Sequence, residues 1–296
     1  MTMITKTTNS NILEVEGLCK SYDNSFTLKN VSFAVPTGYI MGFIGPNGAG
    51  KTTTIKSIIN SVRYSSGTIK LFGEDSLAST AQINEQIGVV MDAPFYSEDW
   101  TMNDVEAAVS PFYSQWDREK YAELLSTFGI EKKKKVKELS RGMKVKLMMA
   151  VALSHDARLL ILDEPTSGLD PVARDELCDL LGAFMADESK SVLFSTHITA
   201  DLEKIADYIT FIFNGEIIFS GLKETLLEKY VLVKGGLQDL DDDLKQLLIG
   251  LRTYETGFEG MAELTHINKF PKEISFEPIT LEEIIIFMSK GAKSNE

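Results

Sequence analysis

The sequence predicts an α/β fold organised around a largely parallel sheet that carries a phosphate-binding loop. Apolar segments of strand length alternate with amphipathic segments of helix length along the 296 residues, a pattern typical of strands joined by crossover helices. The apolar run Tyr39–Ile44 leads directly into Gly45-Pro46-Asn47-Gly48-Ala49-Gly50-Lys51-Thr52-Thr53, which fills every position of the motif G-x-x-x-x-G-K-T. The length suggests about two domains.

The loop at residues 45–53 predicts a bound nucleoside triphosphate. Its glycines let the backbone turn tightly enough to aim several N–H groups at one anion, and the helix expected near Lys51 adds its positive N-terminal end. Lys51 would reach the β- and γ-phosphates and Thr52 would bind Mg²⁺. A Gly-rich loop can also be an ordinary strand-to-helix turn, but the filled motif between a strand and a helix favours the phosphate site.

Alternating segments around the loop predict an antiparallel β subdomain beside the core. Ile12–Glu16 and Phe26–Val35 alternate apolar and polar residues, as strands with one wet face do, and Thr68–Phe72 is expected to join them. The core sheet continues in apolar runs that have the length of buried strands: Ile87–Met91, Arg158–Asp163, Ser191–Ser195, Tyr208–Phe213 and Glu216–Ser220. Asn214-Gly215 joins the last two as a hairpin turn.

Two regions interrupt this pattern. Residues 101–155 show helical periodicity and no strand, which predicts a helical insertion between two strands of the core sheet. From about residue 222, Gly235-Gly236 and the acidic run Asp239–Asp243 separate short strand-like and helical pieces, which predict a small second domain. The acidic run lacks the ligand spacing of a calcium loop and fits the charged first turn of a helix over Leu240–Leu248.

Composition argues against several functions. The formal net charge of −13 disfavours nucleic-acid binding, because phosphate backbones are bound chiefly by clustered Lys and Arg. Cys19 and Cys178 give neither a disulfide framework nor a metal-ligand spacing, which fits a reduced, cytosolic setting. No apolar stretch approaches the roughly 18 residues that cross a bilayer. Met1–Thr5 resembles the β-galactosidase leader of cloning vectors, so residues 1–10 are expected to be vector-derived or disordered.

A second acidic motif complements the phosphate loop. The apolar run from Arg158 ends in Asp163-Glu164, and phosphoryl transfer needs a metal ligand opposite the phosphates and a group that activates the attacking water. Asp163 would bind the Mg²⁺ held by Thr52, and Glu164 would act as the general base. A buried strand that ends in an acid is common, so the motif alone is weak evidence. It indicates a phosphoryl-transfer site only in combination with the loop at residues 45–53.

Together with Leu139-Ser140-Arg141-Gly142-Met143, these motifs resemble the nucleotide-binding ATPase of ABC transporters over about residues 12–220. The five residues are similar to that family's signature, Leu-Ser-Gly-Gly-Gln, and Ser140 is independently a good helix N-cap. The resemblance implies a P-loop NTPase (RecA-like) core with an antiparallel β subdomain and a helical subdomain at about 93–155. It places the ATPase domain at 11–221 and a C-terminal α+β accessory domain at 222–296.

The resemblance also implies further site residues. Ser140 and Gly142 would contact the γ-phosphate of ATP held by a second copy of the chain, so that two copies enclose two ATP molecules. Asp170, in Ser167-Gly168-Leu169-Asp170, would belong to the D-loop at the dimer interface. His197 would end the switch strand and contact the γ-phosphate, and Tyr22 would stack on adenine. His155 and His266 match no motif.

Three positions in two motifs depart from the family pattern. Asp92 stands where most of these ATPases carry the Q-loop glutamine after the Ile87–Met91 strand, and it could still hold Mg²⁺ or water. In the signature, Arg141 replaces glycine and Met143 replaces glutamine. Arg141 would either add positive charge near the phosphate or face solvent, and the sequence leaves both open.

The predicted function is an ATP- and Mg²⁺-dependent motor subunit that works as a homodimer with a separate transmembrane permease, on the inner face of the cell membrane. Ile279–Phe287 resembles the terminal helix of ATPases in the ABC-2 exporter branch, which includes exporters of drugs and peptides. Pro94, Phe95, Tyr96 and Trp100 would either line a docking groove for the permease or belong to the core of the helical insertion. A soluble ABC ATPase that acts on ribosomes or DNA is the alternative, whereas a P-loop kinase or GTPase would leave Ser140–Met143, Asp170 and His197 unexplained.

Overall fold

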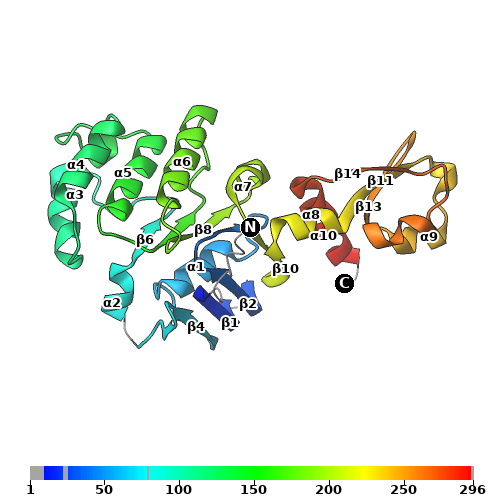
Figure 1. Cartoon of the computed structure of the whole chain (residues 1–296), viewed down its shortest axis with the longest axis horizontal. Coiled ribbons are helices and arrows are strands. Elements are labelled where there is room, and N and C mark those ends of the chain that lie inside the picture. The colour runs from blue at the N-terminus through cyan, green and yellow to red at the C-terminus, as the bar shows by residue number, and fades with distance from the viewer. Residues whose placement is uncertain (1–9, 23–25, 79, 295–296) are drawn as a thin grey trace, which may run out of the picture.

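A six-stranded sheet forms the centre of the computed structural model (Figure 1), which describes residues 10–22, 26–78 and 80–294. The strand order is β10-β9-β3-β8-β7-β6. The strands span Ile40–Ile44 (β3), Ile87–Val90 (β6), Leu159–Asp163 (β7), Ser191–Thr196 (β8), Tyr208–Phe213 (β9) and Glu216–Leu222 (β10). All neighbouring pairs are parallel except β9 and β10, which form the hairpin expected at Asn214-Gly215.

Helices and a second sheet cover both faces of this sheet. Every residue of β3, β7 and β8 is buried, which explains why these segments are nearly continuous apolar runs rather than alternating ones. On one face lies the antiparallel sheet β2-β1-β4-β5, formed by Asn11–Tyr22 (β1), Phe26–Pro36 (β2), Ser66–Leu71 (β4) and Glu74–Asp75 (β5). Helix α1, Lys51–Ile58, packs between the two sheets and buries Ile55 and Ile58 there.

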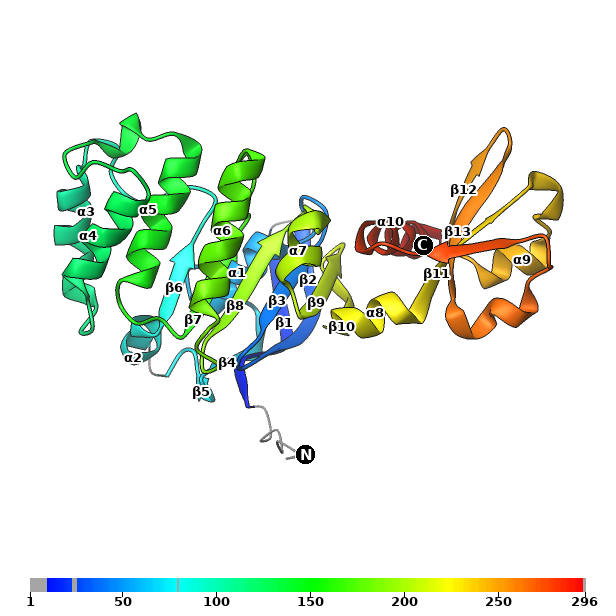
Figure 2. The ribbon, with the colours of Figure 1, turned by 45° about the horizontal axis from the view of Figure 1, so that its top comes forward.

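The insertion between β6 and β7 is helical, as its periodicity predicts. It contains α3 (Met102–Val109), α4 (Arg118–Thr127) and α5 (Arg141–Leu153), with 3₁₀ turns at Ser110–Phe112 and Val136–Glu138, while α2 (Thr80–Glu85) precedes β6. Thr101, Asp117 and Ser140 cap the three main helices with side-chain oxygens, which satisfies first-turn N–H groups. These helices lie at one end of the elongated chain (Figure 2).

Helices α6 (Pro171–Phe184) and α7 (Thr199–Ile205) contribute, with α5, to the cluster on the other face of the core sheet. Beyond β10 follow α8 (Lys223–Lys229), β11 (Tyr230–Gly235), a 3₁₀ turn at Leu237–Asp239, α9 (Asp242–Leu247), β12 (Ile249–Tyr254), β13 (Gly257–Glu263), a 3₁₀ turn at Leu264–Lys269, β14 (Ser275–Pro278) and α10 (Leu281–Ser294). The four strands form an antiparallel sheet in the order β12-β13-β11-β14. The fold class expected from the sequence is therefore confirmed.

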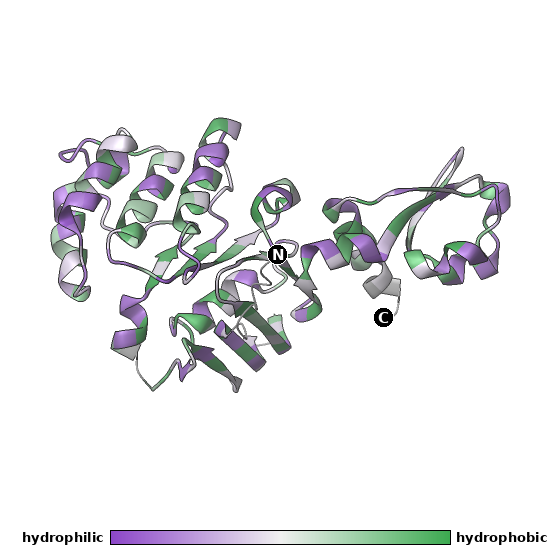
Figure 3. Cartoon of the chain, in the orientation of Figure 1, coloured by the Kyte–Doolittle hydropathy of each residue, from purple (hydrophilic) through white to green (hydrophobic). Residues whose placement is uncertain are grey.

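The C-terminal sheet buries both of its faces. One face packs against α9 through Leu244, and the other packs against α10, whose Ile284 and Phe287 join the same apolar cluster as Leu202 of α7. Figure 3 shows apolar residues along the inner strands of both regions. The acidic run begins the α9 helix as expected, since Asp241 caps it by accepting from the Leu244 N–H at 2.8 Å. The helix is shorter than expected, and residues 1–9 lie outside the described residues.

Candidate nucleotide-hydrolysis site

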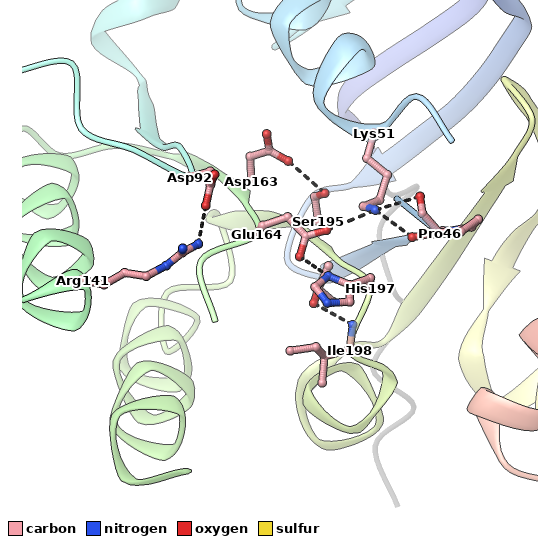
Figure 4. A network of polar contacts seen from close by, with 11 residues as sticks. Pro46, Lys51, Asp92, Arg141, Asp163, Glu164, Ser195, His197 and Ile198 are labelled. Carbon is pink, nitrogen blue, oxygen red and sulfur yellow. Dashed lines mark hydrogen bonds and ion pairs between the residues drawn. The ribbon is translucent and has the colours of Figure 1, made fainter. Parts of the chain in front are cut away.

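Four loops that follow neighbouring parallel strands meet at one edge of the core sheet. The phosphate loop follows β3, His197 follows β8, Glu164 follows β7 and Asp92 follows β6. The carboxyl ends of parallel strands lie at the same edge, so residues far apart in sequence converge there. Figure 4 shows Glu164 and His197 near Lys51, and Asp92 farther away beside Arg141.

The phosphate loop is held tightly against the core. A Cβ on Gly45 would lie 2.3 Å from the Ile212 carbonyl oxygen, so only glycine allows the loop to leave β3 at this point. The Lys51 ammonium is 5% exposed and donates to the carbonyl oxygens of Gly45 at 2.7 Å and Pro46 at 3.3 Å. Helix α1 begins after Gly50 without a side-chain cap, so its first N–H groups face the loop as an anion site would require.

A cavity of about 520 Å³ adjoins the loop. It is lined by Asn47, Gly48, Gly50, Lys51, Thr52, Thr53 and Glu164, and by the aromatic rings of Tyr22 and Phe26. The two aromatic residues are paired across the hairpin of β1 and β2, and the Tyr22 ring is 38% exposed. The cavity therefore combines a polar, cationic end with an aromatic end, as a nucleotide requires.

Asp163 and Thr52 provide oxygen atoms beside the loop. The Asp163 side chain is 1% exposed and accepts a hydrogen bond from Ser195 Oγ at 3.1 Å. Burial raises the pKa of the Asp163 carboxyl, and the hydroxyl groups of Thr52 and Ser195 only partly offset that effect. A buried carboxylate next to a hydroxyl fits Mg²⁺, which prefers oxygen ligands. No group of three or more His, Cys, Asp or Glu side chains suited to a metal occurs in the described ranges. Mg²⁺ in proteins commonly takes one or two carboxylates together with water and phosphate oxygens.

Glu164 contacts two other ionisable groups at this edge, His197 and Lys51. Its Oε2 lies 2.7 Å from Nδ1 of His197. Its Oε1 lies 3.1 Å from Lys51 Nζ, an ion-pair distance without hydrogen-bond geometry. The Glu164 backbone has a φ of +53°, a left-handed conformation that non-glycine residues rarely adopt and that clusters at functional sites.

The signature and D-loop residues lie at helix N-termini outside this cavity. Ser140 caps α5 by accepting from the Met143 N–H at 3.3 Å, with Gly142 in the first turn. Asp170 caps α6 by accepting from the N–H groups of Val172 and Ala173, both at 3.0 Å. The N–H groups of Ala173 and Val172 hold the pKa of the Asp170 carboxyl below its ordinary value.

Known proteins share this sequence and arrangement. A family model described as ABC transporter matches residues 28–167. The uncharacterized ABC transporter ATP-binding protein YxlF of Bacillus subtilis (strain 168) is 36% identical over 223 residues, which cover 74% of this chain and 73% of that protein. This chain belongs to the family of ABC transporter ATP-binding proteins. It is therefore the ATP-binding subunit of an ABC transporter, and members of this family are ATPases.

Further similarities agree with that assignment. The bacitracin transport ATP-binding protein BcrA of Bacillus licheniformis is 32% identical over 211 residues, covering 71% of this chain and 69% of that protein. A solved structure of an ATP-binding subunit of an ABC transporter superposes with a TM-score of 0.66 at 29% identity, covering 73% of this chain and 91% of that one. The P-loop NTPase fold of the core is thus shared with known ABC ATPases.

The structure shows an unexpected partner for Asp92. Asp92 was expected to bind Mg²⁺ or water, but its carboxylate forms an ion pair with the Arg141 guanidinium at 2.5 Å. Because the Asp92 carboxylate is paired with the guanidinium, the arrangement gives no support to Asp92 as a metal ligand. Arg141 accordingly does not simply face solvent.

Sequence reasoning missed two contributors to the ATPase site. Phe26 lines the cavity beside the phosphate loop together with its cross-strand partner Tyr22, and the signal was its position at the start of the strand that pairs back on Tyr22. Ser195 donates to the buried Asp163 carboxylate, and the signal was a hydroxyl near the end of the strand that borders β7. Both lie on segments that the sequence assigned correctly as strands.

Proposed function

We propose that this ATP-binding subunit works as a homodimer in which two copies enclose two ATP molecules, each ATP held by the loop at residues 45–53 of one copy and by Ser140 and Gly142 of the other. The observation that carries the proposal is the separation of the motifs. The phosphate loop and Glu164 line one cavity, whereas the signature residues at the N-terminus of α5 do not line it. A second chain would bring the missing anion-binding helix end to the phosphates.

The residues then have distinct roles in hydrolysis. Lys51 and the loop N–H groups bind the phosphates, Thr52 and Asp163 hold Mg²⁺, and Tyr22 stacks on adenine. Mg²⁺ would neutralise charge on the phosphate oxygens when bound. The Glu164 carboxylate accepts a proton from the attacking water, and His197 orients it through the 2.7 Å contact. Asp170 would lie at the interface, where its carboxylate also caps α6.

The subunit is proposed to drive export through a separate permease at the inner face of the cell membrane. None of the helices in the described part of the chain has the length and apolar character of a membrane span. Relatives include a bacitracin transport ATP-binding protein, which favours drugs or peptides as cargo. Phe95 is 80% exposed and Trp100 37% exposed on the segment after β6, whereas Tyr96 packs into the core, so the docking surface would use the first two rings.

The Glu164→Gln variant tests the catalytic and dimeric parts together. Loss of the base should slow hydrolysis by about 100-fold or more, while ATP binding persists and an ATP-dependent dimer accumulates in sedimentation velocity. Glu188→Gln, an exposed change before β8 at the opposite edge of the sheet, is the matched control and should behave as the parent. A Glu164→Gln protein that stayed monomeric in saturating Mg-ATP and hydrolysed at the parental rate would contradict the proposal.

A further inference from the structure

An ion pair joins two of the three positions that depart from the usual family pattern. Asp92 Oδ1 and Arg141 Nη2 lie 2.5 Å apart although 49 residues separate them in sequence. Asp92 follows β6 of the core sheet, and Arg141 is the first residue of α5 in the helical insertion. The pair therefore connects the core sheet directly to the helix that carries the signature (Figure 4).

Arg141 also lies against the D-loop of the same chain. A Cβ on Gly168 would come within 3.1 Å of Arg141 Cδ and 3.2 Å of its Nε, and Gly168 has a φ of +73°. The positive φ favours glycine at this position, and the arginine side chain lies close beside it. A Cβ on the next signature residue, Gly142, would be in ordinary van der Waals contact with Leu169 at 3.4 Å, and these two residues line one small pocket. The start of α5 therefore lies beside two consecutive D-loop residues.

Electrostatics explains why the arginine needs its partner. A helix N-terminus carries partial positive charge and favours anions, yet α5 begins with a cation and has no acidic residue in its first turn. Asp92 supplies the missing negative charge from the core sheet. The guanidinium is planar and its N–H donors point in fixed directions. Pairing with a carboxylate therefore also restricts the position of the aliphatic part of the Arg141 side chain.

We propose that Asp92 and Arg141 are positioning residues whose ion pair holds the N-terminus of α5 in a fixed place against the core sheet and the D-loop. It thereby sets how Ser140 and Gly142 meet the ATP of the second copy. The inference rests on the two-copy site proposed above and assigns Asp92 to Arg141 rather than to Mg²⁺. The Asp92 and Arg141 side chains are 63% and 49% exposed, and exposed pairs contribute little to folding. Loss of the pair therefore changes the assembly and its activity rather than the fold.

A double-mutant cycle in the Glu164→Gln background tests this inference. Asp92→Asn and Arg141→Gln should each raise the dissociation constant of the ATP-dependent dimer by about threefold to tenfold. The dissociation constant of the double variant should not exceed that of the more affected single variant. Arg141→Lys keeps the charge but loses the planar fork, so its dissociation constant should lie between those of the parent and Arg141→Gln. Lys29→Gln breaks a comparably exposed pair with Glu216 and should change nothing.

Each other outcome overturns the inference. Additive losses, or single variants that match the parent, would show that the pair does not act as a unit. A loss in Asp92→Asn that excess Mg²⁺ restores, also in the Arg141→Gln background, would identify Asp92 as a metal ligand instead. If the Glu164→Gln parent itself fails to dimerise, the two-copy proposal is what fails. In that case the same four proteins are compared by kcat in the chain that keeps Glu164. Non-additive losses of kcat would support the positioning role, and additive losses would refute it.

Discussion

Lys51 Nζ lies 3.1 Å from Glu164 Oε1, with only 5% and 14% of the two side chains exposed. The cation proposed to bind phosphate thus touches the carboxylate that is proposed to activate water. On this proposal, the ATP phosphates compete with Glu164 for the same ammonium group. We therefore expect the Glu164 charge to assist hydrolysis but to oppose binding.

Removing that charge should tighten nucleotide binding. We expect Glu164→Gln to bind Mg-ADP about fivefold more tightly, or by about 1 kcal/mol, because one unit of repulsion and one competitor for Lys51 disappear. ADP is the appropriate probe, since it lacks the γ-phosphate through which a second copy would add affinity. Titration with a fluorescent ADP analogue measures the effect. His197→Ala leaves the Glu164 charge in place and should bind ADP as the parent does; unchanged or weaker binding by Glu164→Gln would refute the competition.

Ser140 has two separable roles, as a helix cap and as a phosphate contact. Ser140→Ala should lower the free energy of unfolding by about 1 kcal/mol, since the Met143 N–H loses its acceptor. Ser140→Asp keeps a good cap, so its stability should match the parent, but its negative charge would repel the partner's ATP and abolish the ATP-dependent dimer. Urea unfolding and sedimentation measure the two effects. Normal dimerisation by Ser140→Asp would leave Ser140 with the capping role alone.

Local sequence codes account for what could be predicted. Three of the predicted features depend on residues within a few positions of one another: the phosphate loop, the Ser140 cap and the Asn214-Gly215 hairpin. Their chemistry can therefore be predicted without knowledge of the fold. The Asp92–Arg141 pair and the Phe26 ring depend on which strands and helices become neighbours. For Phe26 the predicted hairpin gave a signal, but the charges of Asp92 and Arg141 do not identify each other as partners in the sequence. The strand order of the C-terminal sheet is equally a product of long-range packing.

His155 predicts a loss of stability in mild acid. Its ring is 2% exposed, stacks on Tyr113 at 3.8 Å and has Nδ1 3.1 Å from the Glu85 carbonyl oxygen. Burial lowers the pKa of His155 below its ordinary value of 6.5, although the Glu85 carbonyl opposes the shift. Below pH 6.5 the unfolded chain binds a proton at His155 more readily than the folded chain does. The contribution of the neutral His155 to the free energy of unfolding is therefore complete above pH 6.5 and is lost as the pH falls through the folded pKa.

The His155→Gln variant isolates this contribution. It should be less stable than the parent at pH 7.5, because the stacked ring is lost. The difference should shrink at lower pH, because the variant has no buried imidazole to protonate. Urea midpoints at pH 7.5 and 5.5 provide the test. A difference between the two proteins that stayed constant across this range would exclude His155 as a source of acid sensitivity.

Phe287 ties the C-terminal helix to the ATPase core. It is fully buried in the cluster that contains Leu202 of α7, and the Leu281 N–H donates to Glu203 Oε1 at 3.1 Å. Phe287→Ala should cost about 3–5 kcal/mol through the cavity it leaves, whereas Leu77→Ala, 62% exposed, should stay within about 0.5 kcal/mol of the parent. Because one cluster spans both regions, chemical unfolding should show a single transition. A separate early transition in Phe287→Ala would mean that the C-terminal region folds independently.

Phe95 offers a test of permease docking. Phe95 is 80% exposed three residues after Asp92, so replacing it removes little packing within the chain. Phe95→Ser should leave the thermal midpoint and the ATPase rate of the isolated subunit unchanged, but reduce its recovery with membranes from cells that express the complete transporter. Phe112→Ser is a matched control, because Phe112 is 76% exposed on the same helical insertion but outside the segment after β6. Equal membrane recovery of the two variants would rule out Phe95 as a docking residue, and recovery of the parent with ribosomes instead of membranes would favour the soluble alternative.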